Sequence, residues 1–248
     1  MLYSEEFHQV SKKHGVGRGN LEGLPDRGHE ELQTVRYKVY LDVPEISLEK
    51  SHLDGNLGET ISRRKSKRDF SHISLTQKEI STLLAYSCGL WSQGVVGASE
   101  EGGESHRAHP SAGARYPIET YLFNFIGGEI PAGIYHYNVK RHALSVLEER
   151  TFTPFDINQR FDYEWTEKAS CALVFTSIFR RNQFKYGERG YRYILIEAGH
   201  IGQNVTLVAE ALDLKTYMMG GTFDSSLEKD LDIDGVSESI IYGAIIGK

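Results

Sequence analysis

Cysteine, a basic excess and long hydrophobic runs are scarce or missing in this sequence, and each gap excludes a class of protein. Only two cysteines occur, which excludes a disulfide framework, and Cys88 and Cys171 lie in apolar stretches that predict buried thiols. The net charge is −6 with both signs interspersed, so no broad positive face would meet a nucleic acid. No stretch approaches the ~18 apolar residues of a membrane-spanning helix, and the first residues show no signal-peptide layout. These features predict a cytoplasmic protein that binds neither nucleic acid nor membrane.

Length and composition are typical of one globular domain. Hydrophobic residues make up 40% and charged residues 25% of 248 residues, near globular averages, and the length allows a sizeable core. Residues 1–58 mix charges and glycines with little periodicity. We interpret them as a partly irregular N-terminal arm with a short helix near Ser4 to Lys13, ahead of a domain over residues 59–248.

Periodic patterns predict the main helices and strands of an α+β domain. Apolar residues three and four apart predict a helix from Leu75 to Cys88, stopped by Gly89, and a long core helix over about Gly190 to Leu212. Strands are predicted in runs rich in aromatic and β-branched residues, namely ETYLFNFI, GIYHYN, ALSVLEE, SCALVFTSI, LKTYMM and SIIYGAIIG. Their order indicates a mostly antiparallel central sheet flanked by helices.

Two further segments complete this outline. The stretch WSQGVVGASEEGGESHRAHPSAGARYP is rich in glycine and small polar residues, so we expect a long loop, a kind of segment that is commonly functional. DSSLEKDL predicts a short helix capped by Asp224 or Ser225.

The stretch RRKSKR places five cations in six positions around Ser66. Alternate residues of an extended segment point the same way, so Arg64, Ser66 and Arg68 would share one face. Two guanidiniums with a hydroxyl between them suit an anionic ligand such as phosphate. A solvated run of surface charge is the alternative interpretation.

Two stretches of small residues could bring backbone amides close to a flat ligand. HPSAGARYP combines Ser111, Gly113 and Arg115, and its alternative is a plain surface turn. MMGGTFD ends a predicted strand in two glycines before a helix, where exposed amides can donate to a ring atom. A simple strand-to-helix turn is the alternative for the second stretch.

The stretch FKYGERGYR sets Lys185 beside Tyr186 and adds Arg189 and Arg192 just ahead of the long helix. A lysine acts as a base near neutral pH only when burial or neighbouring cations lower its pKa, and the two arginines would supply part of that field. The alternative is a turn in which the lysine stem packs on apolar surface and the arginines pair with carboxylates.

Polar residues interrupt the apolar stripe of the long helix, and buried polar groups need hydrogen bonds. We expect a structural role for Glu197 and Asn204. No metal site is predicted, because His106 and His109 lack a nearby thiolate or third ligand.

The order of these motifs resembles SagB-type dehydrogenases of the FMN-dependent nitroreductase superfamily, which include azoline dehydrogenases. RxSxR comes early, PSxGxRxP lies in the middle and GGTFD comes late, and the resemblance extends through KYGERGYRYILIEAGHIGQNVTLVAEAL to YGAIIG. It implies a nitroreductase-like fold and an interface-sharing homodimer, in which residues of the partner chain complete each FMN site.

The resemblance also implies roles for particular residues. The phosphate and ring edge of FMN would be held by Arg64, Lys65, Ser66 and Arg68, and Ser111, Gly113 and Arg115 would close over the cofactor. Backbone amides around Gly220, Gly221 and Thr222 would meet the flavin atom that receives hydride. Lys185 would be the base, with Tyr186 sharing or relaying the proton. Many relatives add a basic C-terminal segment that binds the phosphate. Here either Lys248 would substitute, or the phosphate would rely on Arg64 and a residue elsewhere.

The activity expected from the resemblance is oxidation of a thiazoline or oxazoline to a thiazole or oxazole in a peptide or peptide-like intermediate. A cyclodehydratase or carrier protein would deliver the substrate, and electrons would pass to oxygen. One alternative is an NAD(P)H-dependent nitroreductase or quinone reductase. Another is an FMN-bearing scaffold subunit of a biosynthetic complex.

Overall fold

The structure is a computed structural model and describes residues 37–40, 43–49, 56–92, 95–96 and 105–248. The short helix predicted near Ser4 to Lys13 lies outside these residues. None of the helices in the described part of the chain is long and apolar enough to cross a membrane.

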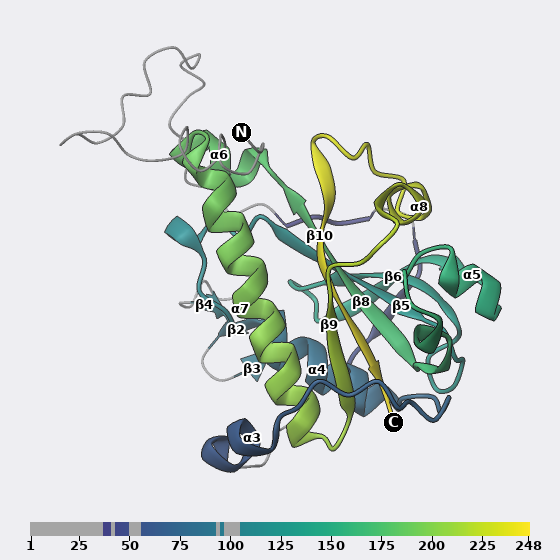
Figure 1. The fold of residues 1–248 in the computed structure, drawn as a ribbon. Helices are drawn as coiled ribbons and strands as arrows, with labels where there is room; N and C mark the ends of the chain where they lie inside the picture. Colours follow the sequence, from purple (N-terminus) through teal and green to yellow (C-terminus); the bar gives the residue numbers. More distant parts are fainter. Residues whose placement is uncertain (1–36, 41–42, 50–55, 93–94, 97–104) are drawn as a thin grey trace, which may run out of the picture.

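A seven-stranded sheet forms the centre of the molecule (Figure 1). Its strands are β1 (Glu45–Ser47), β5 (Ile118–Asn124), β6 (Gly133–Asn138), β7 (Ala143–Glu149), β8 (Cys171–Ile178), β9 (Lys215–Met219) and β10 (Glu238–Gly247). Their spatial order is β1-β7-β6-β5-β8-β10-β9, and each neighbouring pair is antiparallel. The predicted α+β class with an antiparallel sheet is therefore confirmed, and β9 is an edge strand.

A second sheet of three short strands corrects the prediction of one long loop after the first helix. It comprises β2 (Leu90–Ser92), β3 (Val95–Val96) and β4 (Ser105–Arg107), in the order β3-β2-β4. Two or three residues per strand are too few to show an alternating pattern among glycines, which is why the sequence did not reveal them.

Two of the helices match the strongest periodic patterns. The described helices are α3 (Leu57–Arg63), α4 (Gln77–Cys88), α5 (Pro154–Asn158), α6 (Arg180–Tyr186), α7 (Arg189–Ala211) and α8 (Asp224–Asp230), with 3₁₀ turns η1 (Ala112–Ala114) and η2 (Glu164–Lys168). The predicted α4 and α7 are confirmed, and Gly89 follows α4 as expected. The predicted cap of α8 is wrong: Phe223 holds the cap position without a side-chain hydrogen bond, and the Asp224 carboxylate accepts one from the Thr222 hydroxyl.

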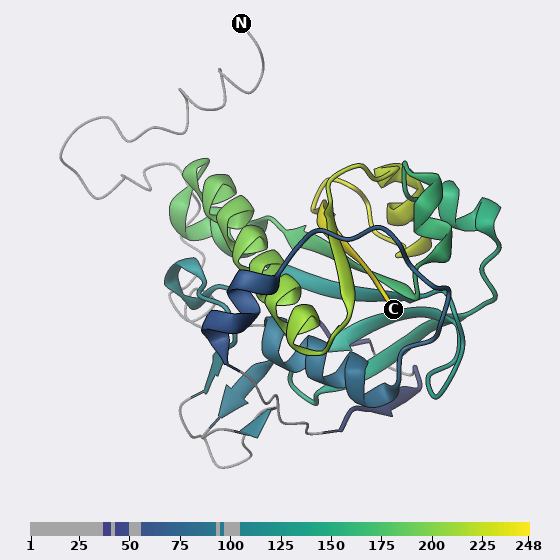
Figure 2. The ribbon, with the colours of Figure 1, turned by 60° about the horizontal axis from the view of Figure 1, so that its bottom comes forward.

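The sheet separates two hydrophobic cores. On one face, α4 and α7 pack their apolar stripes against strand residues such as Leu122 and Phe175, and both cysteines are buried there as predicted. On the other face, Phe123 and Val174 belong to a second core with side chains of α5 and α8. Figure 2 shows α7 crossing the sheet with α3 at its C-terminal end, and the chain after α3 running past β9.

The segment before β1 is tied to the face of the sheet that carries the second core. The Lys38 ammonium donates to the Tyr121 hydroxyl at 2.5 Å and to the Glu238 carboxylate at 2.6 Å. A polar network therefore lies within this otherwise apolar core.

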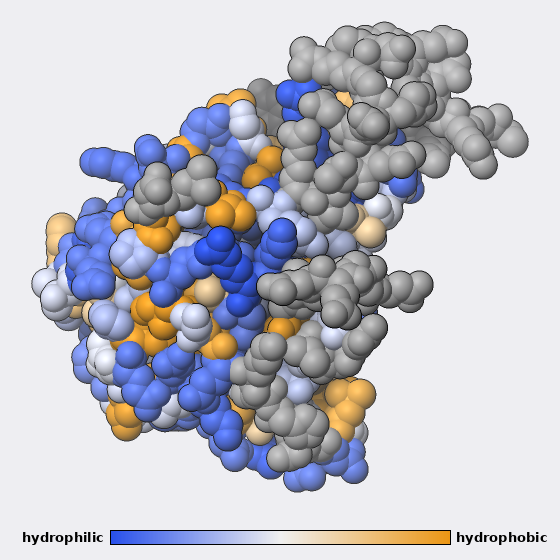
Figure 3. Space-filling view, turned by 180° about the vertical axis from the view of Figure 1, so that it is seen from behind, coloured by the Kyte–Doolittle hydropathy of each residue, from blue (hydrophilic) through white to orange (hydrophobic). Residues whose placement is uncertain are grey.

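Seen from behind, the described residues show hydrophobic side chains in separate groups among hydrophilic ones (Figure 3).

Packing of α7 on the sheet should dominate the stability of the domain. Ile201 is fully buried whereas Ile196, on the same helix, is 54% exposed. We expect Ile201→Ala to lower the free energy of unfolding by about 2–5 kcal/mol, because it leaves a cavity in the core. The control Ile196→Ala should change it by about 0.5 kcal/mol or less. Urea titration measures both values, and equal losses would contradict this assignment of the core.

Candidate active site

The cation-rich segment lies beside the edge strand β9. Ser66 forms a parallel bridge with Thr216, and the Lys67 amide donates to the Thr216 carbonyl at 2.9 Å. The Arg68 guanidinium carbon lies 4.3 Å from the centre of the Tyr217 ring. The segment therefore continues the sheet edge and presents an arginine over an aromatic ring.

The diglycine segment leaves the end of the same strand. The Gly221 carbonyl accepts a hydrogen bond from the Asp162 amide at 3.1 Å, which holds the segment against the chain before η2. The amides of Gly221 and Thr222 donate to no acceptor among the residues that the structure describes. Two backbone N–H groups are therefore available to a ligand here.

Aromatic side chains connect these two segments. Tyr217 packs edge-on against Trp165 with ring centres 4.9 Å apart, and Trp165 stacks on Tyr163 at 5.5 Å. A Cβ atom added to Gly221 would lie 3.2 Å from the Tyr163 ring, so the ring packs against the glycine. We call the group formed by Arg64, Lys65, Ser66, Arg68, Gly220, Gly221 and Thr222 the β9-edge cluster.

The other predicted residues meet at the end of α6. A Cβ atom on Gly113 would lie 2.4 Å from the Tyr186 hydroxyl and 2.8 Å from the Lys185 ammonium, so only glycine lets both side chains approach. Gly113 also has φ of +62°, a conformation that glycine adopts without strain. The Arg115 guanidinium donates to the Arg181 carbonyl of α6 at 3.2 Å.

Two glycines give the α6 to α7 connection its shape. Gly187 ends α6 with φ of +55°, and its amide donates to the Gln183 carbonyl at 2.7 Å. A Cβ atom on Gly190 would lie 2.9 Å from the Gln183 Cα, so this glycine lets the start of α7 pack closely on α6. We call Ser111, Gly113, Arg115, Lys185 and Tyr186 the α6 cluster.

The predicted residues thus form two groups within one chain. No hydrogen bond or ion pair joins the β9-edge cluster to the α6 cluster in the described ranges. The α6 cluster lies at the N-terminal end of α7. The segment that begins with Arg64 follows α3, which lies near the C-terminal end of α7 (Figure 1).

Several cations beside β9 are already neutralised. Lys67 pairs with the buried Glu210 at 3.0 Å, and Arg63 pairs with Asp213 at 2.9 Å. These ion pairs fasten the cation-rich segment to the C-terminal end of α7. They leave Lys67 and Arg63 less suited to a ligand.

Other cations of this segment have no carboxylate partner. In the described part of the chain, Arg64, Lys65 and Arg68 form no ion pair. Lys248, a predicted substitute for a basic C-terminal segment, pairs with Glu79 at 2.9 Å. The cations open to an anion are therefore those of the RxSxR motif itself.

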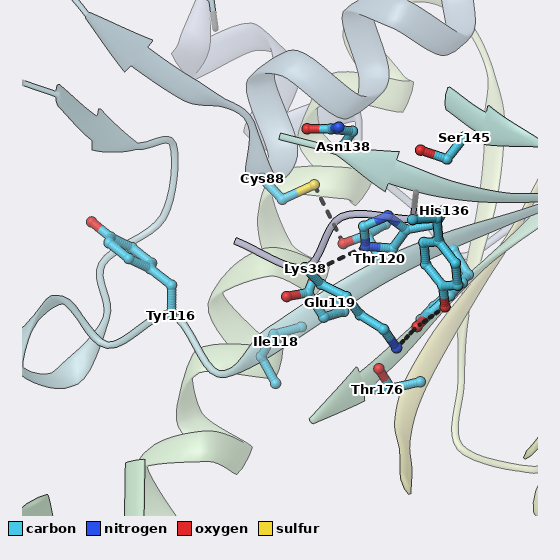
Figure 4. A network of polar contacts seen from close by, with 12 residues as sticks. Lys38, Cys88, Tyr116, Ile118, Glu119, Thr120, His136, Asn138, Ser145 and Thr176 are labelled. Carbon is cyan, nitrogen blue, oxygen red and sulfur yellow. Dashed lines mark hydrogen bonds and ion pairs between the residues drawn. The ribbon is translucent and has the colours of Figure 1, made fainter. Parts of the chain in front are cut away.

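A buried carboxylate that sequence reasoning missed holds α6 in place. Glu119 on β5 is 2% exposed and accepts a hydrogen bond from His136 at 2.9 Å (Figure 4). It also forms an ion pair with Arg181 of α6. Burial raises the pKa of Glu119, but the hydrogen bond from His136 and the charge of Arg181 outweigh it and hold this pKa at about 2. The sequence feature that could have revealed this buried carboxylate is a single glutamate in a strand rich in aromatic residues.

A second buried carboxylate lies beneath residues 109–117, which we call the Ser111 loop. Glu197 of α7 contacts His109 at 3.3 Å. Asn204 donates hydrogen bonds to the carbonyls of Ser87 and Ala108. Both polar side chains therefore have partners within the same chain. His109 was expected in a loose loop and is instead buried. A cavity of about 280 Å³ opens here, lined by Pro110, Ser111, Ala112, Tyr193, Ile196, Glu197 and His200.

Comparison with known proteins identifies the family. The nitroreductase family matches residues 61–248. A Methanocaldococcus jannaschii protein named as a nitroreductase is 30% identical over 195 residues, covering 77% of this chain and 87% of its own. The Escherichia coli microcin B17-processing protein McbC is 35% identical over 142 residues, covering 55% of this chain and 52% of its own. The match thus spans about half the length of McbC. The chain belongs to the nitroreductase family, and the protein is an oxidoreductase.

Solved structures share the fold. A chain of the E. coli microcin synthetase McbBCD complex, with truncated pro-MccB17 bound, matches with a TM-score of 0.65 and 27% identity, covering 99% of this chain and 91% of its own. A nitroreductase-fold protein of Exiguobacterium sibiricum, solved in complex with FMN, has a TM-score of 0.52 and 11% identity, covering 79% and 90%. The nitroreductase-like fold and the resemblance to SagB-type members are confirmed.

The low pKa of Glu119 makes stability depend on pH. An unfolded glutamate has its ordinary pKa near 4.5, so this group stabilises the fold fully above that pH and loses the contribution as pH falls toward 2. Between pH 7 and pH 3, the free energy of unfolding of the Glu119→Gln variant should fall by about 2 kcal/mol less than that of the wild type. Urea unfolding at both pH values measures this difference. The control Glu164→Gln, at an exposed position, should follow the wild-type curve. Identical pH curves for all three proteins would contradict the assignment.

Proposed function

We propose that this oxidoreductase is an FMN-dependent dehydrogenase that oxidises thiazoline or oxazoline rings to thiazoles or oxazoles in a peptide or peptide-like intermediate, with oxygen as the final electron acceptor. The contact of Lys185 and Tyr186 with Gly113 is the observation that carries the proposal. In this contact the Lys185 amine of α6 approaches the loop expected to close over the cofactor, which supports a role as the base. The similarity to a microcin-processing protein supports a peptide substrate.

The β9-edge cluster fits FMN. Arg64, Lys65 and Arg68 have no carboxylate partner in the described residues, which suits a phosphate that needs charge-assisted hydrogen bonds. The available amides of Gly221 and Thr222 suit an electron-rich ring atom. The cations and the amides both lie along the β9 edge of the sheet. The cations would hold the phosphate, and the amides would contact the flavin ring.

A homodimer would complete the site. Among the described residues, no hydrogen bond or ion pair is seen between the α6 cluster and the β9-edge cluster of the same chain, although the reaction needs a base next to the cofactor. We therefore propose that the α6 cluster of one protomer faces the β9-edge cluster of its partner. The outer face of α7 supports this arrangement, because Leu195 and Ile196 are exposed apolar residues next to the α6 cluster.

Oxidation of the azoline removes one proton and one hydride from adjacent ring atoms. FMN, when bound, supplies the hydride acceptor. The Lys185 amine would take the proton, because its side chain ends beside the Gly113 loop. Tyr186 would orient the amine or relay the proton, since the Lys185 nitrogen lies 5.4 Å from the centre of the Tyr186 ring. Reduction of nitroaromatics or quinones by NAD(P)H would not require this pair.

Removal of the base should abolish oxidation and leave the cofactor in place. We expect Lys185→Ala to keep its FMN and to lower kcat for a synthetic azoline peptide by about 10²–10⁴-fold, the usual contribution of a general base. The control Lys140→Ala changes a lysine in an exposed turn and should retain activity. FMN absorbance and product mass measure the two properties. Undiminished turnover by Lys185→Ala would remove the assignment, and continued ring formation in the complex would favour a scaffold subunit.

The unpaired arginine should matter more for FMN than a paired neighbour. We expect Arg68→Ala to weaken FMN binding about tenfold or more, because a charge-assisted contact is lost. Arg63→Ala should change it less than about twofold, since Arg63 already pairs with Asp213 and Glu210. Quenching of FMN fluorescence by the apoprotein gives both dissociation constants. Equal losses would indicate that net charge alone attracts the cofactor.

A further inference from the structure

The cavity under the Ser111 loop has the size of part of a ligand. Its volume of about 280 Å³ is just below the roughly 300–1,000 Å³ that hold a whole drug-sized molecule. Pro110, Ala112, Tyr193 and Ile196 give it mostly apolar walls. It therefore suits one residue of a longer chain.

One wall of the cavity carries an unsatisfied hydrogen-bond acceptor. Glu197 is 1% exposed, and its Oε1 atom lies 3.3 Å from His109 Nε2. Its Oε2 atom is buried and has no hydrogen-bond partner. Such an atom costs about 1–3 kcal/mol unless a donor reaches it. The described residues of the chain provide no donor to this oxygen.

The state of His109 fixes what Glu197 can bind. Burial lowers the pKa of His109, despite the opposing hydrogen bond to Glu197, so the imidazole is neutral at neutral pH. In the tautomer that carries its proton on Nε2, the imidazole donates to Glu197 Oε1. The carboxylate is left as an acceptor, and it selects a group with an N–H or O–H donor.

The cavity adjoins the proposed base. Ser111 and Ala112 precede Gly113, which contacts Lys185 and Tyr186. Tyr193, from the cavity wall, packs edge-on against the Tyr186 ring with centres 5.0 Å apart. A ligand seated in the cavity would therefore extend to the α6 cluster.

We propose that this cavity is a substrate subsite, in which the peptide residue next to the azoline ring is held by a hydrogen bond from its backbone N–H to Glu197. The inference rests on the proposed function, because it takes the substrate to be a peptide. A backbone amide is the donor that every peptide carries beside the ring, and apolar walls accept the side chain attached to it. Glu197 would bind substrate and take no part in proton transfer.

Binding of a peptide that cannot react tests the subsite without catalysis. The probe is a fluorescein-labelled tripeptide that contains a thiazole, prepared with free amides and with each flanking amide N-methylated in turn. We expect the wild-type FMN-loaded protein to bind the free amide about tenfold more tightly than one of the two methylated forms, from fluorescence anisotropy. This ratio should fall to about one in Glu197→Ala and to an intermediate value in Glu197→Gln.

Two further variants keep the result interpretable. Gln203→Ala changes an exposed residue of α7 and should retain the tenfold ratio. Ile196→Trp should fill the cavity, weaken binding of the free-amide probe and leave Glu197 intact, so it covers the case in which Glu197→Ala does not fold. Because Ile196 also lies on the exposed face of α7, gel filtration must show that this variant keeps the oligomeric state of the wild type. A wild-type protein that does not bind the probe, or the same ratio in wild type and Glu197→Gln, would overturn the proposal. Discrimination between the amides without oxidation of an azoline would refute the proposed function alone.

Discussion

Burial of one side of α7 against the sheet is the constraint on which the rest of the structure depends. Ile194, Ala198, Ile201 and Val205 are buried in the core, and each large side chain contributes roughly 1.5–3 kcal/mol. The fixed helix then places three features along its length. Its first turn holds α6 and the Lys185–Tyr186 pair, its middle forms a cavity wall, and its last turn anchors the cation-rich segment through Glu210.

Charged side chains in this structure differ in whether their hydrogen-bond and ion-pair partners lie within the chain. Glu119 is satisfied by a histidine and an arginine, so it fastens α6 to the sheet. Glu197 is as deeply buried but keeps one oxygen without a donor. The same contrast holds for cations, since Lys67 pairs with Glu210 whereas Arg68 has no carboxylate in the described ranges. Glu197 and Arg68 therefore keep bonding capacity that Glu119 and Lys67 already use within the fold.

The sequence was informative where patterns are long and local. The helices α4 and α7 and the strands β5 to β10 were predicted because their patterns extend over many residues. The strand β1 was missed, because its three residues lie in the segment expected to be a partly irregular arm. The helix α6 was missed, since RRNQFKY has no apolar stripe, and the cap of α8 was assigned to the wrong residue. These elements are determined by tertiary contacts, such as the ion pair of Arg181 with Glu119.

The same limit applies to the site. The motifs identified the residue types, but the contact between Gly113 and Lys185, and the pairing of His109 with Glu197, join residues far apart in the chain. Spacing carries no information on such contacts. Nor does it reveal that one chain places its two clusters apart (Figure 1), and this arrangement is the reason for proposing a site shared between two protomers.

The absorbance of the bound flavin under anaerobic conditions tests the central claim most directly. A synthetic azoline peptide is added to one sample of the FMN-loaded protein, and NAD(P)H to another. The account predicts that the peptide bleaches the flavin and leaves as an azole lighter by two hydrogens, while NAD(P)H bleaches it far more slowly. Rapid bleaching by NAD(P)H, with no change caused by the peptide, would contradict it.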